Sequence, residues 1–230
     1  MNPGHLAKAI VHWLEFERLC ERGKLITESS LKFPLHNYLS ATTSTVVELE
    51  VPIQGLPANT GRKKSIDFVL TRPGGQHAWQ HAIESKFVTD KRSFLQEVFD
   101  DIFRLDWISN AGQDEPFERW LLLAGTHNHL HSQVFDVEIN PGGGAARIPA
   151  FGTILSRDLQ QPNHVVQIST SQGRIRQLWR NAAHELGQNQ FPTSMRVILG
   201  AAEPAGAAGQ NFVCYIWRVT HQQNRNHHPI

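Results

Sequence analysis

The segment SIDFVLTRPGGQHAWQHAIESKF, residues 65–87, decides the fold. Its two ends, SIDFVL (65–70) and AIESKF (82–87), are short and apolar-rich, and Pro and Gly lie between them. This pattern predicts two successive strands. Asp67 interrupts the first strand, and Glu84 and Lys86 interrupt the second. Because side chains alternate along a strand, Glu84 and Lys86 are expected to project from the same face.

These three ionisable side chains predict a chemical site. Burying such groups costs free energy unless they form pairs or bind a metal ion. Mg²⁺ prefers oxygen ligands and is commonly held by carboxylates together with phosphate oxygens of a substrate. Asp67 and Glu84 can supply the carboxylates, the backbone carbonyl of Ser85 a further oxygen, and Lys86 a positive charge beside the attacked phosphate. The alternative is a buried ion pair of Lys86 with Asp67 or Glu84 that has no catalytic role.

The hydrophobic pattern of the whole chain predicts helices that alternate with strands. Pro34 limits where the second helix can begin, and its start can be as late as Phe33. The third helix begins with a capping box of Ser93 and Gln96, and residues 221–230 are expected to form a frayed tail. The predicted helices are 5–22, 31–39, 91–108 and 175–186, and the predicted strands are 46–53, 65–70, 82–87, 120–125, 196–201 and 211–219, the last two paired. This order predicts an α/β fold with a mixed central β-sheet flanked by helices.

Length and composition are those of a globular protein. The chain has 230 residues, of which 40% are hydrophobic and 19% are charged, and this favours a single domain over residues 1–230. No apolar run approaches the ~18 residues that span a membrane, and no signal-like stretch begins the chain, so we expect a cytoplasmic protein with no membrane partner. Cys20 and Cys214 can form neither a disulfide framework nor a cysteine zinc site.

The formal net charge of +1 hides an uneven distribution. Up to Asn140 there are 14 Lys and Arg against 18 Asp and Glu, a balance of −4. From Pro141 onward the numbers are 8 and 3, a balance of +5, and all eight cations are arginine. Near-neutrality excludes indiscriminate binding of nucleic acid through a uniformly basic surface, but it is compatible with local contacts between arginine and phosphate. The alternative for these arginines is a solvated helix face.

An Asp on one strand and Glu-x-Lys on the next, here SIDFVL and AIESKF, resembles the PD-(D/E)xK nuclease superfamily. The resemblance covers about residues 25–125, where a helix and a strand precede the motif and a capped helix and another strand follow it. Ile66 stands where the family name has Pro. The resemblance implies a restriction-endonuclease-like core over residues 25–125, and the helix and β-hairpin of residues 150–220 would be a C-terminal extension.

The activity implied by this resemblance is hydrolysis of phosphodiester bonds that depends on Mg²⁺ or Mn²⁺. The expected substrate is DNA rather than RNA, as for a restriction or phage-defence endonuclease, and such enzymes often act as homodimers. Asp67, Glu84 and the Ser85 carbonyl would hold the metal ion, and Lys86 would orient the nucleophile or stabilise the transition state. The alternative is a catalytically inactive protein of the same fold that acts as a nucleic-acid-binding or protein-interaction module.

The family often adds an acid from the helix before the first strand. Glu28 fits by position, with Glu15 and Glu17 as rivals, and Glu50 can lie nearly opposite Asp67 in the first hairpin. A surface carboxylate is the alternative for each of them. The basic residues expected to contact nucleic acid are Lys63, Lys64, Lys91, Arg92, Arg174, Arg176 and Arg180.

Two further features carry alternatives. Arg104, in the helix 91–108, can face the site or form a salt bridge with Asp100 or Asp101. The alternating histidines of THNHLH are interpreted as a polar loop, with a zinc or similar metal site as the alternative; they are His127, His129 and His131.

Overall fold

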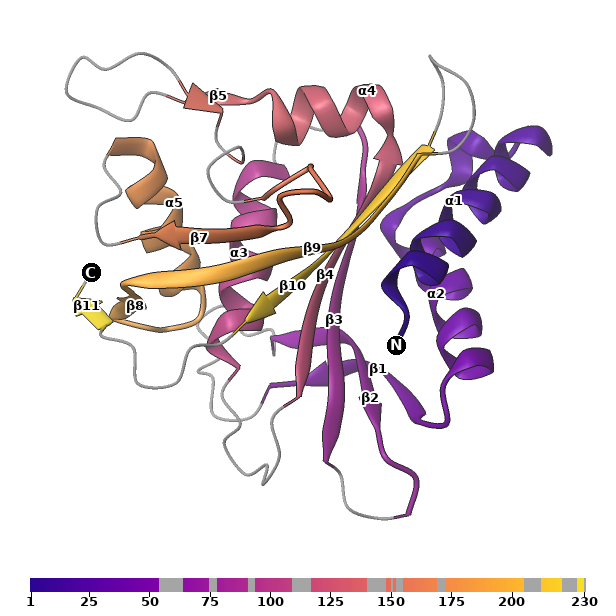
Figure 1. Ribbon diagram of the computed structural model, residues 1–230, viewed down its shortest axis with the longest axis horizontal. Coiled ribbons are helices and arrows are strands. Elements are labelled where there is room, and N and C mark those ends of the chain that lie inside the picture. Colours follow the sequence, from indigo (N-terminus) through magenta and orange to yellow (C-terminus); the bar gives the residue numbers. More distant parts are fainter. Residues whose placement is uncertain are drawn as a thin grey trace.

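The computed structural model describes residues 1–53, 64–74, 78–90, 94–108, 117–139, 148–149, 151, 155–168, 173–204, 212–220 and 227–229. Its helical segments are α1 (Pro3–Leu19), η1 (Gly23–Leu25), α2 (Glu28–Thr42), α3 (Phe94–Trp107), α4 (His127–Leu130), η2 (His131–Phe135) and α5 (Gly173–Glu185). Its strands are β1 (Val46–Pro52), β2 (Ser65–Thr71), β3 (Trp79–Val88), β4 (Glu118–Thr126), β5 (Glu138–Ile139), β6 (Ile148–Pro149), β7 (Asn163–Gln167), β8 (Gln190–Pro192), β9 (Ser194–Pro204), β10 (Phe212–Thr220) and β11 (His227–Pro229). The fold is α/β, with helices packed against a twisted sheet (Figure 1).

Seven strands form one mixed sheet in the order β1-β2-β3-β4-β10-β9-β7. β3 and β4 are parallel and are connected through α3, whereas the other neighbouring strands are antiparallel. Gly125 of β4 lies opposite Val88 of β3, and a Cβ atom there would meet the Val88 carbonyl oxygen at 2.6 Å. Glycine therefore allows these two strands to approach each other closely. β10 and β9 continue the sheet beyond β4, so the C-terminal hairpin belongs to the same sheet as the motif strands.

Two hydrophobic clusters cover the two faces of the sheet. On one face α1 and α2 bury an apolar stripe that includes Ile10 and Leu35. On the other face α3 and α5 pack together, and the rings of Phe99 and Trp179 meet edge to face with centroids 4.7 Å apart. Figure 1 shows the two helix pairs on opposite sides of the strands. The helix predicted within residues 91–108 is confirmed as α3, and its apolar face buries Val98, Phe99 and Ile102.

The second helix begins earlier than predicted. The Thr27 hydroxyl accepts a hydrogen bond from the Ser30 N–H, and the Ser30 hydroxyl oxygen accepts one from the Thr27 N–H. This capping box starts α2 at Glu28, and the helix continues through Pro34. Leu31 and Leu35 are buried on either side of the proline, so packing against the sheet outweighs the loss of one backbone donor. Glu28 is consequently helical.

Two other predictions are wrong. His127, His129 and His131 do not lie in a loop but in α4 and η2, because the Thr126 hydroxyl caps a helical turn by accepting a hydrogen bond from the His129 N–H. The predicted frayed tail contains β11, which pairs with β8; residues 221–226 of that tail lie outside the described residues. β7, which pairs with β9 at the edge of the sheet, was not predicted.

Cys20 and Cys214 are both free thiols, the first exposed and the second buried. Within the described residues, no helix is long and apolar enough to cross a bilayer.

Candidate active site

The pairing of β2 with β3 brings together the first two members of the predicted motif. Phe68 pairs with Ile83, so Asp67 lies beside the peptide that links Glu84 to Ser85. The Asp67 Oδ2 atom accepts hydrogen bonds from the Ser85 N–H, at 2.9 Å, and from the Ser85 hydroxyl, at 3.1 Å. Asp67 and Glu84 are buried, with 8% and 2% of their surface exposed. The two carboxylates thus lie on adjacent strands in a largely dry environment.

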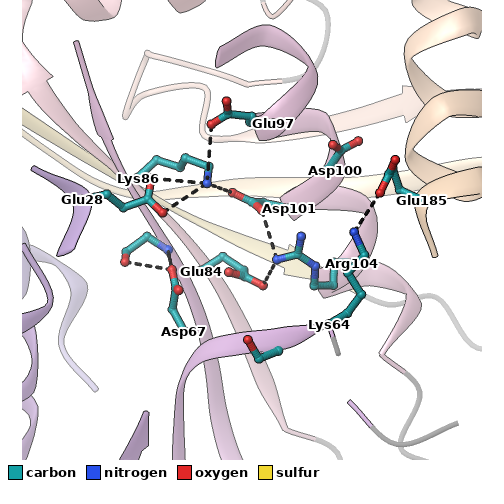
Figure 2. Close-up of polar contacts among 12 residues, drawn as sticks. Glu28, Lys64, Asp67, Glu84, Lys86, Glu97, Asp100, Asp101, Arg104 and Glu185 are labelled. Carbon is teal, nitrogen blue, oxygen red and sulfur yellow. Dashed lines mark hydrogen bonds and ion pairs between the residues drawn. The ribbon is translucent and has the colours of Figure 1, made fainter. Parts of the chain in front are cut away.

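Lys86 is surrounded by carboxylates from two helices (Figure 2). Its Nζ atom lies 3.4 Å from both Glu28 carboxylate oxygens, 3.5 Å from Asp101 Oδ2 and 3.8 Å from Glu97 Oε2. Burial by itself lowers the pKa of Lys86, but the charges of Asp101, Glu28 and Glu97 outweigh it and leave this pKa above its ordinary value. Lys86 is therefore a permanent ammonium at neutral pH, suited to stabilising negative charge and not to accepting a proton.

Glu84 is paired with a basic residue of α3. Arg104 Nη1 lies 2.6 Å from Glu84 Oε1 and 3.2 Å from Asp101 Oδ1, so one guanidinium contacts two buried carboxylates (Figure 2). Burial raises the pKa of Glu84 well above its ordinary range, and the nearby Arg104 charge only partly opposes this rise. Burial also raises the pKa of Asp101, against the charges of Lys86 and Arg104. Both alternatives foreseen for Arg104 hold, because it faces the site and pairs with Asp101.

Asp67 has a basic partner from α2. Lys32 Nζ lies 2.9 Å from Asp67 Oδ1 and also forms an ion pair with Glu50. Burial lowers the pKa of Lys32, but the hydrogen bonds with Glu50 and Asp67 more than compensate, so the net shift is upward. The register Leu49↔Phe68 confirms the prediction that Glu50 lies nearly opposite Asp67.

The two rivals of Glu28 on α1, Glu15 and Glu17, are not at this site. Glu15 pairs with Arg18 at 2.7 Å, and Glu17 pairs with Arg22 at 2.7 Å on the surface of α1. Glu28, the first residue of α2, contacts Lys86 instead, and burial raises its pKa against the opposing charge of Lys86.

The predicted nucleic-acid contacts are distributed unevenly. Lys64 is paired with Glu185 of α5 at 2.8 Å (Figure 2). Arg174 is exposed on α5, while Arg176 and Arg180 are half-buried there. α5 packs on α3, which carries site residues on another of its faces. Three further residues that are predicted to contact nucleic acid lie outside the described residues, namely Lys63, Lys91 and Arg92. The predicted Ser93 cap also lies outside them.

The histidine cluster does not converge on one point. The rings of His127 and His131 stack with centroids 4.1 Å apart, and His131 Nδ1 lies 3.0 Å from Asp136 Oδ2. His127 and His129 line a surface pocket of about 640 Å³ beside the end of α1.

Sequence reasoning missed three residues of the site: Lys32, Glu97 and Asp101. Glu97, Asp101 and Arg104 are spaced i, i+4 and i+7, which places them on one face of α3. Lys32 likewise follows Glu28 at i+4 on α2. These charged faces were a usable signal, but only the docking of both helices against β2 and β3 shows that they meet.

The ion pairs at this site join six acidic side chains to three basic ones. The acidic residues are Glu28, Glu50, Asp67, Glu84, Glu97 and Asp101, and the basic residues are Lys32, Lys86 and Arg104. The formal excess of negative charge fits the chemistry of a hard divalent cation. Within the described residues, however, no group of three or more His, Cys, Asp or Glu side chains is arranged to hold a metal ion. Lys32 is paired with Asp67, and Arg104 is paired with Glu84.

Comparisons of the chain with protein-family models, with curated proteins and with solved structures find no match. The class of this site therefore rests on its own geometry. That geometry is a partly buried cluster of carboxylates around three basic side chains, centred on the β2 and β3 strands of an α/β fold.

Proposed function

We propose that this protein is a metal-dependent nuclease that hydrolyses phosphodiester bonds. The observation that carries the proposal is the position of the Lys86 ammonium. Lys86 lies on β3, the strand that also supplies Glu84, and its ammonium contacts carboxylates of α2 and α3. The element order α2, β1, β2, β3, α3, β4 matches the order on which the resemblance to the PD-(D/E)xK superfamily rests. A restriction-endonuclease-like core is part of the same proposal.

Asp67 and Glu84, with the Ser85 carbonyl, would hold Mg²⁺ or Mn²⁺. Such an ion, when bound, lowers the pKa of a coordinated water and neutralises charge on the phosphate. Hydrolysis forms one phosphorus–oxygen bond and breaks another, and negative charge grows on the phosphate oxygens as this happens. Lys86 stabilises that charge from a fixed position, because Glu28 and Asp101 hold its ammonium in place.

The proposed substrate is DNA, and the proposed assembly is a homodimer. Lys64 lies three residues before Asp67, and the arginines of α5 lie on the helix that contacts α3. These cations suit local contacts with backbone phosphates, as do Lys63, Lys91 and Arg92 in the sequence. With a net charge of +1, binding would be local and sensitive to salt.

The test is a cleavage assay on plasmid DNA, single-stranded DNA and RNA, each with Mg²⁺, Mn²⁺ or a chelator. The wild type is compared with Asp67→Asn and with Asp90→Asn, an exposed aspartate that serves as a matched control. We expect cleavage with either metal ion in the wild type and in Asp90→Asn, and none in Asp67→Asn. Cleavage that continues in chelator or in Asp67→Asn would contradict the proposal.

A second candidate is a catalytically inactive protein of the same fold that binds nucleic acid or a protein partner. It is favoured by one observation, namely that Lys32 and Arg104 already neutralise the two proposed metal ligands. Tight binding of DNA or RNA without cleavage of any of the three substrates would support this candidate.

A further inference from the structure

The Lys32 ammonium occupies the position beside Asp67 where a metal ion would bind. Its Nζ atom lies between Asp67 of β2 and Glu50 of β1, and Lys32 itself is on α2. The three side chains differ in exposure: 12% for Asp67, 20% for Lys32 and 55% for Glu50. The ammonium is thus held between an inner carboxylate and an outer one.

Asp67, the inner carboxylate, has one oxygen that accepts no hydrogen bond from Ser85. Asp67 Oδ2 already accepts two hydrogen bonds from Ser85, whereas Oδ1 contacts Lys32 Nζ at 2.9 Å. A metal ion bound through Oδ1 would come within a few ångströms of the ammonium, and two cations at that separation repel each other strongly in a partly buried site. The metal ion and Lys32 therefore compete for the same oxygen atom.

The outer carboxylate is held in an unusual backbone conformation. Glu50 has a φ of +52°, and among the described residues other than glycine only Glu21 also has a positive φ. A non-glycine residue adopts this conformation at a cost in free energy, so the surrounding structure must favour it. Here the Ser65 hydroxyl donates to Glu50 Oε2 at 2.9 Å, and Lys32 contacts Oε1. The bent backbone presents Glu50 to Lys32.

We propose that Lys32 is an internal counter-cation that a divalent metal ion displaces from Asp67, and that Glu50 retains the displaced ammonium. This inference rests on the proposed function. The lysine stem is long and flexible, and Glu50 is the more exposed partner, so Lys32 can move outward without losing its ion pair. Lys32 opposes metal binding, and Glu50 reduces the cost of displacing it.

The test is calorimetric titration of the full chain with Mn²⁺ and with Mg²⁺, in the absence of any nucleic acid. Four variants are compared with the wild type: Lys32→Met, Glu50→Gln, the double variant of both, and Asp67→Asn. Lys8→Met removes an exposed lysine of α1 and controls for net charge. Thermal unfolding of each variant establishes that it is folded.

We expect Lys32→Met to lower the Kd for the metal ion by about tenfold or more, since a competing like charge has been removed from within contact distance. Glu50→Gln should weaken binding in the wild type but have little effect in the Lys32→Met background, because Glu50 acts through Lys32. Asp67→Asn should abolish this binding, and Lys8→Met should leave it unchanged.

The outcomes separate this inference from the proposed function. If the wild type binds metal through Asp67 but Lys32→Met has an unchanged or higher Kd, displacement of Lys32 is wrong and the metal site stands. If Glu50→Gln weakens binding equally in both backgrounds, Glu50 is a direct ligand and its role as acceptor of the lysine is wrong. If neither the wild type nor Lys32→Met binds metal through Asp67, both proposals are overturned.

Discussion

Arg104 of α3 and Glu84 of β3 form a buried ion pair, with Nη1 and Oε1 2.6 Å apart. The same guanidinium lies 3.2 Å from Asp101, so α3 is joined to the motif strand by a shared charge. This ion pair orients α3 so that the helix face with Glu97 and Asp101 lies against Lys86. The orientation of the helix and the electrostatics of the site are therefore set by the same contact.

Replacing Arg104 with Met should destabilise the protein by about 3 kcal/mol at neutral pH, because it leaves the buried Glu84 carboxylate without its cation. Burial already raises the pKa of Glu84, and losing Arg104 raises it further. Protonation of Glu84 in acid then removes the uncompensated charge, so the loss relative to wild type should be larger at pH 8 than at pH 5. Urea denaturation at both pH values measures this. A Glu84→Gln/Arg104→Met double variant that is no more stable than Arg104→Met at pH 8 would contradict the explanation.

Asp100 should make the protein less stable as the pH rises. Burial raises the pKa of Asp100 from 3.8 to about 6, against the hydrogen bond donated by Gln96. The folded state therefore binds this proton more tightly than the unfolded state, and the free energy of unfolding should fall between about pH 4 and pH 6. Asp100→Asn should remove this fall and stabilise the protein at pH 7 by up to roughly 3 kcal/mol. Chemical denaturation across this range tests it, with the exposed Asp90→Asn as the control, for which a similar gain would refute the assignment.

Asp101 and Asp100 are adjacent aspartates of α3 with different partners. Asp101 contacts Lys86 and Arg104, whereas Asp100 accepts a hydrogen bond from Gln96 at 2.7 Å. If the proposed function is correct, Asp101→Asn should reduce cleavage about tenfold or more by loosening the Lys86 ammonium. Asp100→Asn should leave the rate unchanged. Single-turnover cleavage of a DNA substrate compares the two, and equal losses would mean that the effect comes from α3 in general.

Lys86 should matter for the chemical step more than for binding. Because its ammonium is positioned by three carboxylates, Lys86→Ala should lower the cleavage rate by about 10²–10³-fold, the usual effect of losing one preorganised electrostatic group. DNA affinity in chelator should change little, since one buried lysine adds little to backbone binding. Lys8→Ala, an exposed lysine, is the matched control. A loss of affinity as large as the loss of rate would reassign Lys86 to substrate binding.

Local sequence patterns were sufficient to predict features that depend on a single helix or strand. The strands around Asp67 and Lys86 were predictable because apolar runs bounded by Gly and Pro form strands in most contexts. Alternation along β3 correctly placed Glu84 and Lys86 on one face, where both contact residues of α3. The start of α2 was not predicted, because Pro34 concealed a helix that the Thr27 cap and buried leucines stabilise.

The amino-acid sequence by itself determined the α/β order, the motif strands and the carboxylates that lie on them. Only the tertiary structure decided the ionic partners: Lys32 for Asp67, Arg104 for Glu84, and Glu28 with Asp101 for Lys86. The physical reason is that alternation and periodicity are properties of neighbouring residues, whereas an ion pair between separate elements depends on how both helices dock on the sheet. That docking is set by two hydrophobic clusters whose members come from most of the chain.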